Sequence, residues 1–154
     1  MTVEEFWKAY LNTLPIDHPA RALAIPTAEG YGDSPQLADE LGQLIHRGTK
    51  TATCASLWEY ELEKIPIPHV GQLEIVLDGQ NQPLAITEMI EVQIRPYDEV
   101  DAGFAFEEGE GDRSLQNWRD GHWRFFSRVL AKIGRQPDPK MPLICQRFKV
   151  VFRK

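Results

Sequence analysis

The stretch FAFEEGEGDRSLQNWRDGHWRFF, residues 104–126, concentrates charged and aromatic side chains more densely than a plain core helix requires. It holds five Asp or Glu, three Arg, one His, two Trp and four Phe residues. Like charges so close together repel one another, and they persist where a cation or a hydrogen-bond donor compensates them. We therefore expect another part of the chain to supply a cation to this acidic segment.

The best candidate for that cation is Lys50, in the sequence GTKTAT of residues 48–53. Ser34 followed by Pro35 predicts the start of a helix, and Gly48 predicts its end. Lys50 then follows a helix C-terminus, where the negative end of the helix dipole favours a cation. Our hypothesis is that Lys50 and the acidic segment face each other across one pocket.

The length and composition are those of one globular domain over residues 1–154. Hydrophobic residues make up 42% and charged residues 26% of the chain, as in ordinary soluble proteins. Cys54 and Cys145 give neither a disulfide framework nor a metal-ligand spacing, which predicts a cytoplasmic location. No stretch approaches the roughly 20 apolar residues of a membrane span, so no membrane partner is expected.

The net charge of −6 bears on the class of partner. Proteins that follow duplex nucleic acid usually present a basic face, and this chain has no dense Lys/Arg run outside its last ten residues. We expect a modified nucleoside or a short single-stranded RNA as the ligand, and no duplex DNA. No pattern in the sequence indicates an oligomeric state.

Periodicity predicts an α+β fold. Apolar residues at helical spacing predict helices, and β-branched residues predict strands. The expected helices are 2–14, 34–47, 98–108 and 114–134, and residues 56–64 are expected to form a short helix or an irregular stretch. The expected strands are 72–77, 83–97 and 143–153. Residues 15–33 have no clear period and are expected to form a long loop. Because the strands follow one another without crossover helices, we expect an antiparallel sheet or small barrel with helices before and after it.

These motifs together resemble the ASCH domain superfamily. The sequence of residues 48–53 is similar to its Gly-x-Lys-x-x-Thr motif, and residues 68–71, before a strand, also match. Residues 105–115, which contain EGEGDRSL, together with Trp118 and His122, resemble its longer bacterial branch. The resemblance covers roughly residues 34–152. It implies a PUA-like fold, a small antiparallel or mixed β-barrel flanked by helices, with helix 2–14 and loop 15–33 as an extension.

The resemblance also implies a link to RNA or modified nucleosides. In one branch of the family, an amidohydrolase removes the acetyl group of N4-acetylcytidine with a Lys, a Thr and a Glu, which match Lys50, Thr53 and Glu108. Another branch is associated with cleavage of single-stranded RNA. We expect a hydrolase, with an amidohydrolase acting on an N4-acylated cytidine as the leading interpretation. A metal-assisted ribonuclease and a non-catalytic RNA-binding module are the alternatives.

The chemistry of the three matched residues sets conditions on their pKa values. A Thr hydroxyl is a poor nucleophile unless a neighbour takes its proton. Lys50 could take it if burial lowers its pKa, but a nearby carboxylate opposes that change. We expect Glu108 to act as a proton shuttle, with its pKa raised by Glu107 and Glu110. Backbone N–H groups of residues 48–53 could stabilise an oxyanion.

The ribonuclease interpretation uses the same region differently. Lys50 would hold a phosphate, and Glu107, Glu110 or Asp112 would bind a divalent metal; the amidohydrolase would require no cofactor. The spacing of the four histidines predicts no structural zinc site. The remaining substrate-binding candidates are Tyr31, Gly48, Thr51, Tyr97, Glu110, Arg113, Trp123 and Arg124.

Each of these candidates has a structural alternative. Tyr31 could lie in a surface turn, and Tyr97 and Trp123 could belong to the core rather than stack on a base. Arg113 and Arg124 could form surface ion pairs. His122 is expected to be the hydrogen-bonded partner of an acidic residue rather than a catalyst, and the acidic segment could be a solvated loop.

Overall fold

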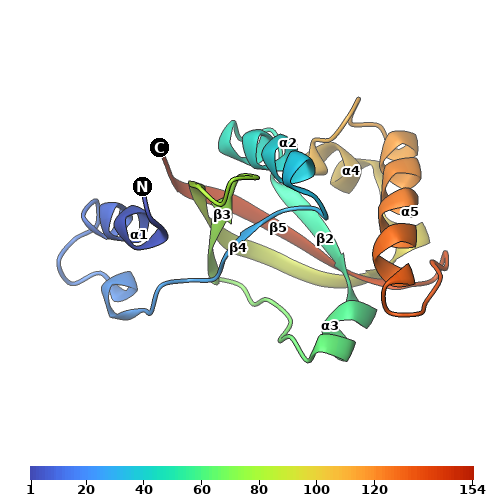
Figure 1. The fold of residues 1–154 in the computed structure, drawn as a ribbon, viewed down its shortest axis with the longest axis horizontal. Coiled ribbons are helices and arrows are strands. Elements are labelled where there is room, and N and C mark those ends of the chain that lie inside the picture. Colours follow the sequence, from blue (N-terminus) through green and yellow to red (C-terminus); the bar gives the residue numbers. More distant parts are fainter. The chain divides into compact units, whose positions relative to one another are not determined.

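The computed structural model describes residues 1–154 (Figure 1). These residues separate into two compact units. Unit 1 comprises residues 1–47, 73–88 and 150–154, and unit 2 comprises residues 48–72 and 89–149. The two longest strands contribute residues to both units. None of the helices combines the length and the apolar character that crossing a membrane requires.

The observed elements follow the predicted ones closely. The helices are α1 (Val3–Leu11), α2 (Pro35–His46), α3 (Leu57–Glu63), α4 (Ala102–Glu108) and α5 (Leu115–Ala131). The strands are β1 (Ala28–Gly30), β2 (Ala52–Ser56), β3 (Leu73–Leu77), β4 (Pro83–Pro96) and β5 (Pro142–Arg153). Short 3₁₀ helices span Pro19–Ala22 and Tyr97–Glu99.

The sheet is mixed, and its strand order is β1-β3-β4-β5-β2. β3 pairs antiparallel with β4, and β2 pairs antiparallel with β5, whereas β1 pairs parallel with β3. The α+β prediction is therefore confirmed, with two corrections. No strand was expected at residues 52–56, where β2 lies. The expected loop at 15–33 contains β1, a strand too short to produce a detectable alternation of apolar and polar residues.

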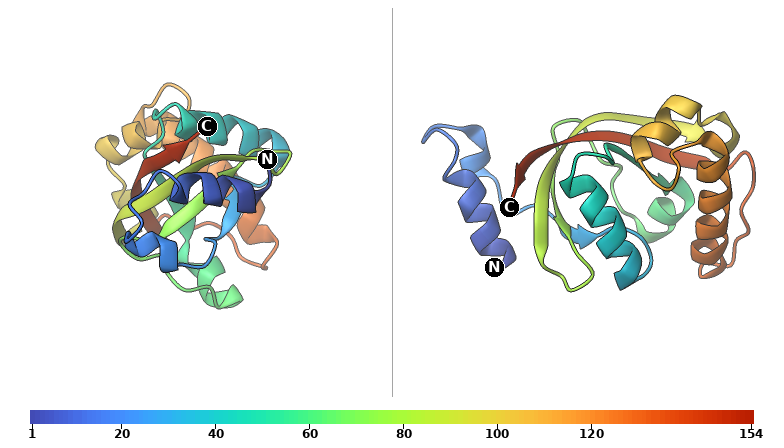
Figure 2. Two further views of the ribbon diagram at one scale, coloured as in Figure 1. Left: turned by 90° about the vertical axis from the view of Figure 1, so that its left-hand side faces the viewer. Right: turned by 90° about the horizontal axis from the view of Figure 1, so that it is seen from above.

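Unit 1 is built around the aromatic face of α1. The helix begins with a capping box, in which the Thr2 side chain accepts from the backbone N–H of Glu5 and the Glu5 carboxylate accepts from that of Thr2. Phe6, which is fully buried, packs edge-on against Phe152 with ring centroids 5.1 Å apart. Within the same unit, α2 packs against β1 and β3 (Figure 2).

Unit 2 places α4 and α5 next to each other, with β2 beside α4 (Figure 1). Asp101 caps α4 and Ser114 caps α5, so both helices begin at side chains that accept a backbone N–H. Trp118 and Phe126 are buried in the core of this unit. Because Trp118 and His122 are four residues apart, they lie on the same face of α5.

We expect Phe6→Ala to lower the free energy of unfolding by about 3–5 kcal/mol, because it removes a fully buried ring and leaves a cavity. Urea denaturation followed by tryptophan fluorescence would measure the change. Ile16→Ala is the matched control, since Ile16 is 86% exposed, and its effect should stay within about 0.5 kcal/mol. Equal effects of the two substitutions would contradict the assignment of α1 to the core.

Candidate functional site

Lys50 is the centre of a buried group of charges in unit 2. It lies in the turn before β2, and only 1% of it is exposed. Its Nζ donates to Glu108 Oε1 at 2.9 Å and to Glu110 Oε2 at 2.9 Å. The side chain of Glu108 is likewise 1% exposed, whereas that of Glu110 is 30% exposed. The structure thus brings the lysine of the GTKTAT sequence into direct contact with two carboxylates of the acidic segment.

The C-terminal turn of α4 is fixed against residues 49–51. The backbone N–H of Thr51 donates to the carbonyl of Glu107 at 2.8 Å. Gly109 ends α4 with φ +75°, and a Cβ there would lie 2.7 Å from the carbonyl oxygen of Thr49. A side chain at this position would therefore force the two segments apart. Glycine at this position lets residues 108 and 110 both approach Lys50.

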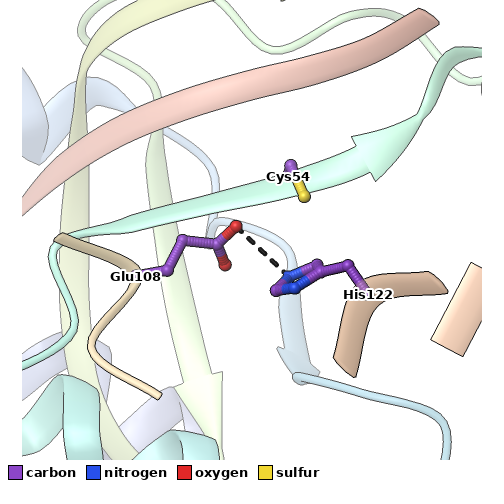
Figure 3. Close-up of side chains that lie close together, drawn as sticks. All are labelled: Cys54, Glu108 and His122. Atoms are coloured by element: carbon purple, nitrogen blue, oxygen red, sulfur yellow. Dashed lines mark ion pairs between the residues drawn. The ribbon is translucent and has the colours of Figure 1, made fainter. Parts of the chain in front are cut away.

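The second oxygen of Glu108 is held from α5. Trp118 Nε1 donates to Glu108 Oε2 at 2.6 Å, and His122 Nε2 lies 3.3 Å from the same oxygen (Figure 3). His122 Nδ1 lies 2.8 Å from the carbonyl oxygen of Trp118, and the two rings stack with centroids 4.2 Å apart. Since a carbonyl only accepts, Nδ1 must carry a proton. A second proton on Nε2 then completes the ion pair with Glu108.

These contacts shift three pKa values. Burial alone would lower the pKa of Lys50, but the carboxylates of Glu108 and Glu110 outweigh burial and raise it. Burial would raise the pKa of Glu108, but Lys50 and His122 outweigh it and hold the carboxyl ionised. Burial would lower the pKa of His122, but Glu108 raises it above the ordinary value. The group is therefore a network of charged side chains.

Cys54 completes the group on the side of β2. Its Sγ, the Glu108 carboxylate and a His122 ring nitrogen all lie within 4.8 Å of one another (Figure 3). Burial raises the pKa of the Cys54 thiol well above its ordinary value, and the neighbouring Glu108 adds to the effect. These three side chains are of types that bind metal ions, and they come from β2, α4 and α5.

Two expectations about proton transfer were wrong. Glu108 was expected to have a raised pKa, but two cations and a Trp N–H surround its carboxylate and lower it. Glu107 does not act on Glu108 as predicted, because its carboxylate pairs with Arg147, which also binds Glu91 at 2.8 Å. Lys50 keeps its proton, so its placement opposes a role as a base.

Thr53 does not join the hydrogen-bonded group. It lies half-buried in β2, where it pairs with Gln146 of β5. Successive side chains of a strand point to opposite faces. Since Cys54 points towards Glu108, Thr53 points to the other face of the sheet, and its hydroxyl makes no hydrogen bond with Lys50 or Glu108.

The proposed carboxylate ligands do not gather around one point. Glu107 pairs with Arg147, and Glu110 pairs with Lys50. Asp112 lies exposed and accepts from the backbone N–H of Ser114 at 2.8 Å. Each carboxylate thus has a different partner, and an oxygen-only metal site at these three residues has no common centre.

The other predicted contacts are distributed over the chain. Tyr97 is buried and its hydroxyl donates to the carbonyl of Arg119 at 2.6 Å, while Trp123 packs 5.3 Å from its ring. Arg113 lies with its guanidinium 3.5 Å from the centroid of the Phe106 ring, and its Nε donates to the carbonyl of Phe106. Arg124 is exposed on α5, and Gly48 lies in the turn after α2. Thr51 directly precedes β2, and Tyr31 belongs to unit 1.

The sequence patterns did not predict two members of the group, Trp118 and Cys54. The sequence pointed to Trp118 only through the family resemblance and predicted no contact for it, whereas its indole N–H donates to Glu108. The i, i+4 spacing of Trp118 and His122 could have indicated that both face one partner. Cys54 carried no signal at all, because its closeness to residues 108 and 122 arises from the pairing of elements. The expectation that His122 pairs with an acidic residue is confirmed.

Comparison with known proteins agrees with this architecture. A model of the ASCH domain family matches residues 27–152. A solved structure of a protein from Enterococcus faecalis V583 is 41% identical, with a TM-score of 0.86, covering 97% of this chain and 87% of that one. A solved ASCH domain from Lactobacillus crispatus JV V101 is 30% identical, with a TM-score of 0.90, covering 98% and 94%. A search of the curated proteins finds no match. The expected PUA-like fold is confirmed.

We expect Lys50→Met to lower the free energy of unfolding by about 3–5 kcal/mol, because it leaves the buried Glu108 carboxylate without its main cation. The double variant Lys50→Met/Glu108→Gln should recover part of that loss. Lys140→Met is the control, since Lys140 is 75% exposed in its pair with Asp98 and should contribute less than about 1 kcal/mol. Urea denaturation would compare the four proteins.

We expect an NMR titration in buffer with EDTA to place the pKa of His122 above 6.5. In Glu108→Gln, His122 stays buried but loses the neighbouring negative charge. Burial disfavours the charged imidazolium, so the pKa of His122 should fall below 6.5. A raised pKa in the folded state means that the stability from protonated His122 is full below pH 6.5 and is lost as the pH rises through the folded pKa. An unchanged pKa in Glu108→Gln would exclude the ion pair.

Proposed function

Because this chain belongs to the ASCH domain family, we propose that it binds a cytidine-like nucleoside or a short single-stranded RNA next to Lys50. One observation carries the proposal. Lys50 joins the fully buried Glu108 to Glu110, whose side chain is 30% exposed. Glu110 is thus the carboxylate of the pair that a ligand can reach from solvent.

The chemistry of these groups suits the polar edge of cytosine. A carboxylate accepts from the N4 amino group of cytosine. If Glu110 turns from Lys50 to that amino group, one Lys50 N–H becomes available to an acceptor on the base. Glu108 would keep Lys50 in place during the exchange, since their 2.9 Å ion pair is buried. Glu110 and Lys50 would then supply one acceptor and one donor to the base.

The charge distribution supports a nucleic-acid ligand in unit 2. This unit holds 12 Lys or Arg and 13 Asp or Glu residues, a net charge of −1. Unit 1 holds 5 and 10, a net charge of −5, so most of the net negative charge lies in unit 1. Arg124, Arg128 and Lys132 are exposed and four residues apart along α5 and its C-cap. Such a row can contact successive phosphates of a short strand.

Amide hydrolysis of an N4-acylated cytidine is a second candidate, favoured by the contact of Lys50 with two carboxylates. With Lys50 protonated, we assign it the stabilisation of the oxyanion, and Glu110 the activation of water. Water would add to the acyl carbonyl, and the cytidine amine would leave with a proton. Thr53 as nucleophile stays a prediction, as do metal-assisted RNA cleavage and the cytoplasmic location.

We expect fluorescence anisotropy to detect binding of a labelled oligocytidylate, weakened about tenfold in Glu110→Gln, since a good contact to a base contributes about 1–3 kcal/mol. Glu99→Gln, an exposed acid of the same unit, is the control and should bind like the wild type. Unchanged binding in Glu110→Gln, or no binding by the wild type, would refute the proposal.

The hydrolase candidate has its own assay. Purified protein incubated with N4-acetylcytidine should release cytidine, and Lys50→Met should abolish the release. In parallel, single-stranded RNA with and without a divalent cation tests the ribonuclease interpretation. Binding without either activity would leave the RNA-binding module as the function.

A further inference from the structure

We propose that Cys54, Glu108 and His122 form a binding site for Zn²⁺. Their sulfur, oxygen and nitrogen atoms lie within 4.8 Å of one another and point towards a common centre (Figure 3). The site rests on this geometry and does not depend on the proposed function. The three residues come from separate elements, so the site exists only in the folded chain.

The donor set selects the metal. A thiolate, an imidazole and a carboxylate are the three ligand types that Zn²⁺ takes in proteins. Mg²⁺ and Ca²⁺ prefer oxygen ligands, and Cys54 and His122 offer none. Three protein ligands with a fourth position left for water is the arrangement of catalytic zinc centres, whereas structural sites use four protein ligands.

The distances fit a tetrahedral ion. Two ligand atoms about 2.0–2.1 Å from a tetrahedral Zn²⁺ lie roughly 3.3 Å apart. Glu108 Oε2 and His122 Nε2 are 3.3 Å apart. A sulfur about 2.3 Å from the ion lies roughly 3.6 Å from the other two ligands. Cys54 Sγ lies within 4.8 Å of both atoms, so each of these distances would have to shorten by no more than about 1.2 Å.

The surrounding contacts already orient the ligands. Metal-binding histidines usually donate their second ring N–H to a carbonyl or carboxylate. His122 Nδ1 lies 2.8 Å from the carbonyl oxygen of Trp118, so Nε2 is the nitrogen that faces Glu108. Lys50 holds Oε1 and Trp118 holds Oε2, which fixes the carboxylate plane. Glu110 balances the charge of Lys50, which would otherwise repel a divalent ion.

His122 and Glu110 are the partly exposed side chains next to the proposed site, so an ion would enter from their side. The side chain of His122 is 12% exposed and that of Glu110 is 30% exposed, while Glu108 and Lys50 are sealed behind them. Solvent can follow to the fourth coordination position from the same direction.

The test uses the full chain, freed of metal with a chelator and then dialysed. Isothermal titration with ZnCl₂ should give one site per chain. Loss of one direct ligand, in Cys54→Ser or His122→Gln, should weaken binding by at least about 100-fold, because even outer contacts of metal sites contribute about 10–100-fold. Cys145→Ser is the matched control, since Cys145 lies directly opposite Cys54 across the β2–β5 pair but outside the group, and it should bind as the wild type does.

Co²⁺ provides a readout on the wild-type protein itself. Bound at this site, it should give an intense near-ultraviolet band from thiolate-to-metal charge transfer and visible bands typical of tetrahedral geometry. Cys54→Ser should lose the near-ultraviolet band, whereas Cys145→Ser should keep it. No stoichiometric Zn²⁺ binding, a bound Co²⁺ without the thiolate band, or a band that depends on Cys145 would overturn the proposal.

Discussion

The burial of the Glu108 carboxylate is the constraint on which the centre of unit 2 depends. An ionised carboxyl group with 1% exposure is tolerated only if hydrogen-bond donors and cations replace water around it. Lys50 supplies one charge from the turn before β2, and α5 supplies an indole N–H and an imidazole. The requirement to satisfy one side chain thus ties together a turn and two helices.

This constraint also decides which chemistry the residues can perform. Because Lys50 and Glu108 stabilise each other as ions, neither exchanges a proton readily near neutral pH. Chemistry that relies on a neutral lysine or on a protonated Glu108 works against the fold. Roles that use a fixed cation, a fixed carboxylate or a metal ion agree with it.

The exposed edge of the group differs from its buried centre. Glu110 shares Lys50 with Glu108 but remains in contact with solvent, so its ion pair can open with less cost than the buried pair. Gly109, between these two glutamates, makes the arrangement possible for two reasons. Its backbone adopts the left-handed conformation that reverses the chain, and the carbonyl of Thr49 lies too close to leave room for a side chain. Residues 108–110 therefore supply both the buried carboxylate that holds Lys50 and a second carboxylate that solvent can reach.

The sequence by itself determined most of the helices and the long strands, because capping residues, glycines and apolar periodicity are local signals. It also indicated that Lys50 contacts the acidic segment that contains Glu108, since a dense acidic segment requires a cation. It placed Thr53 in the same site, although Thr53 points to the other face of the sheet. It did not reveal β1, whose three residues are held by their pairing with β3, or β2, whose five residues pair with β5. It could not give the direction of the Glu108 pKa shift or the place of Cys54. Both depend on which side chains burial brings within a few ångströms, and only the packing of α4 and α5 against β2 decides that.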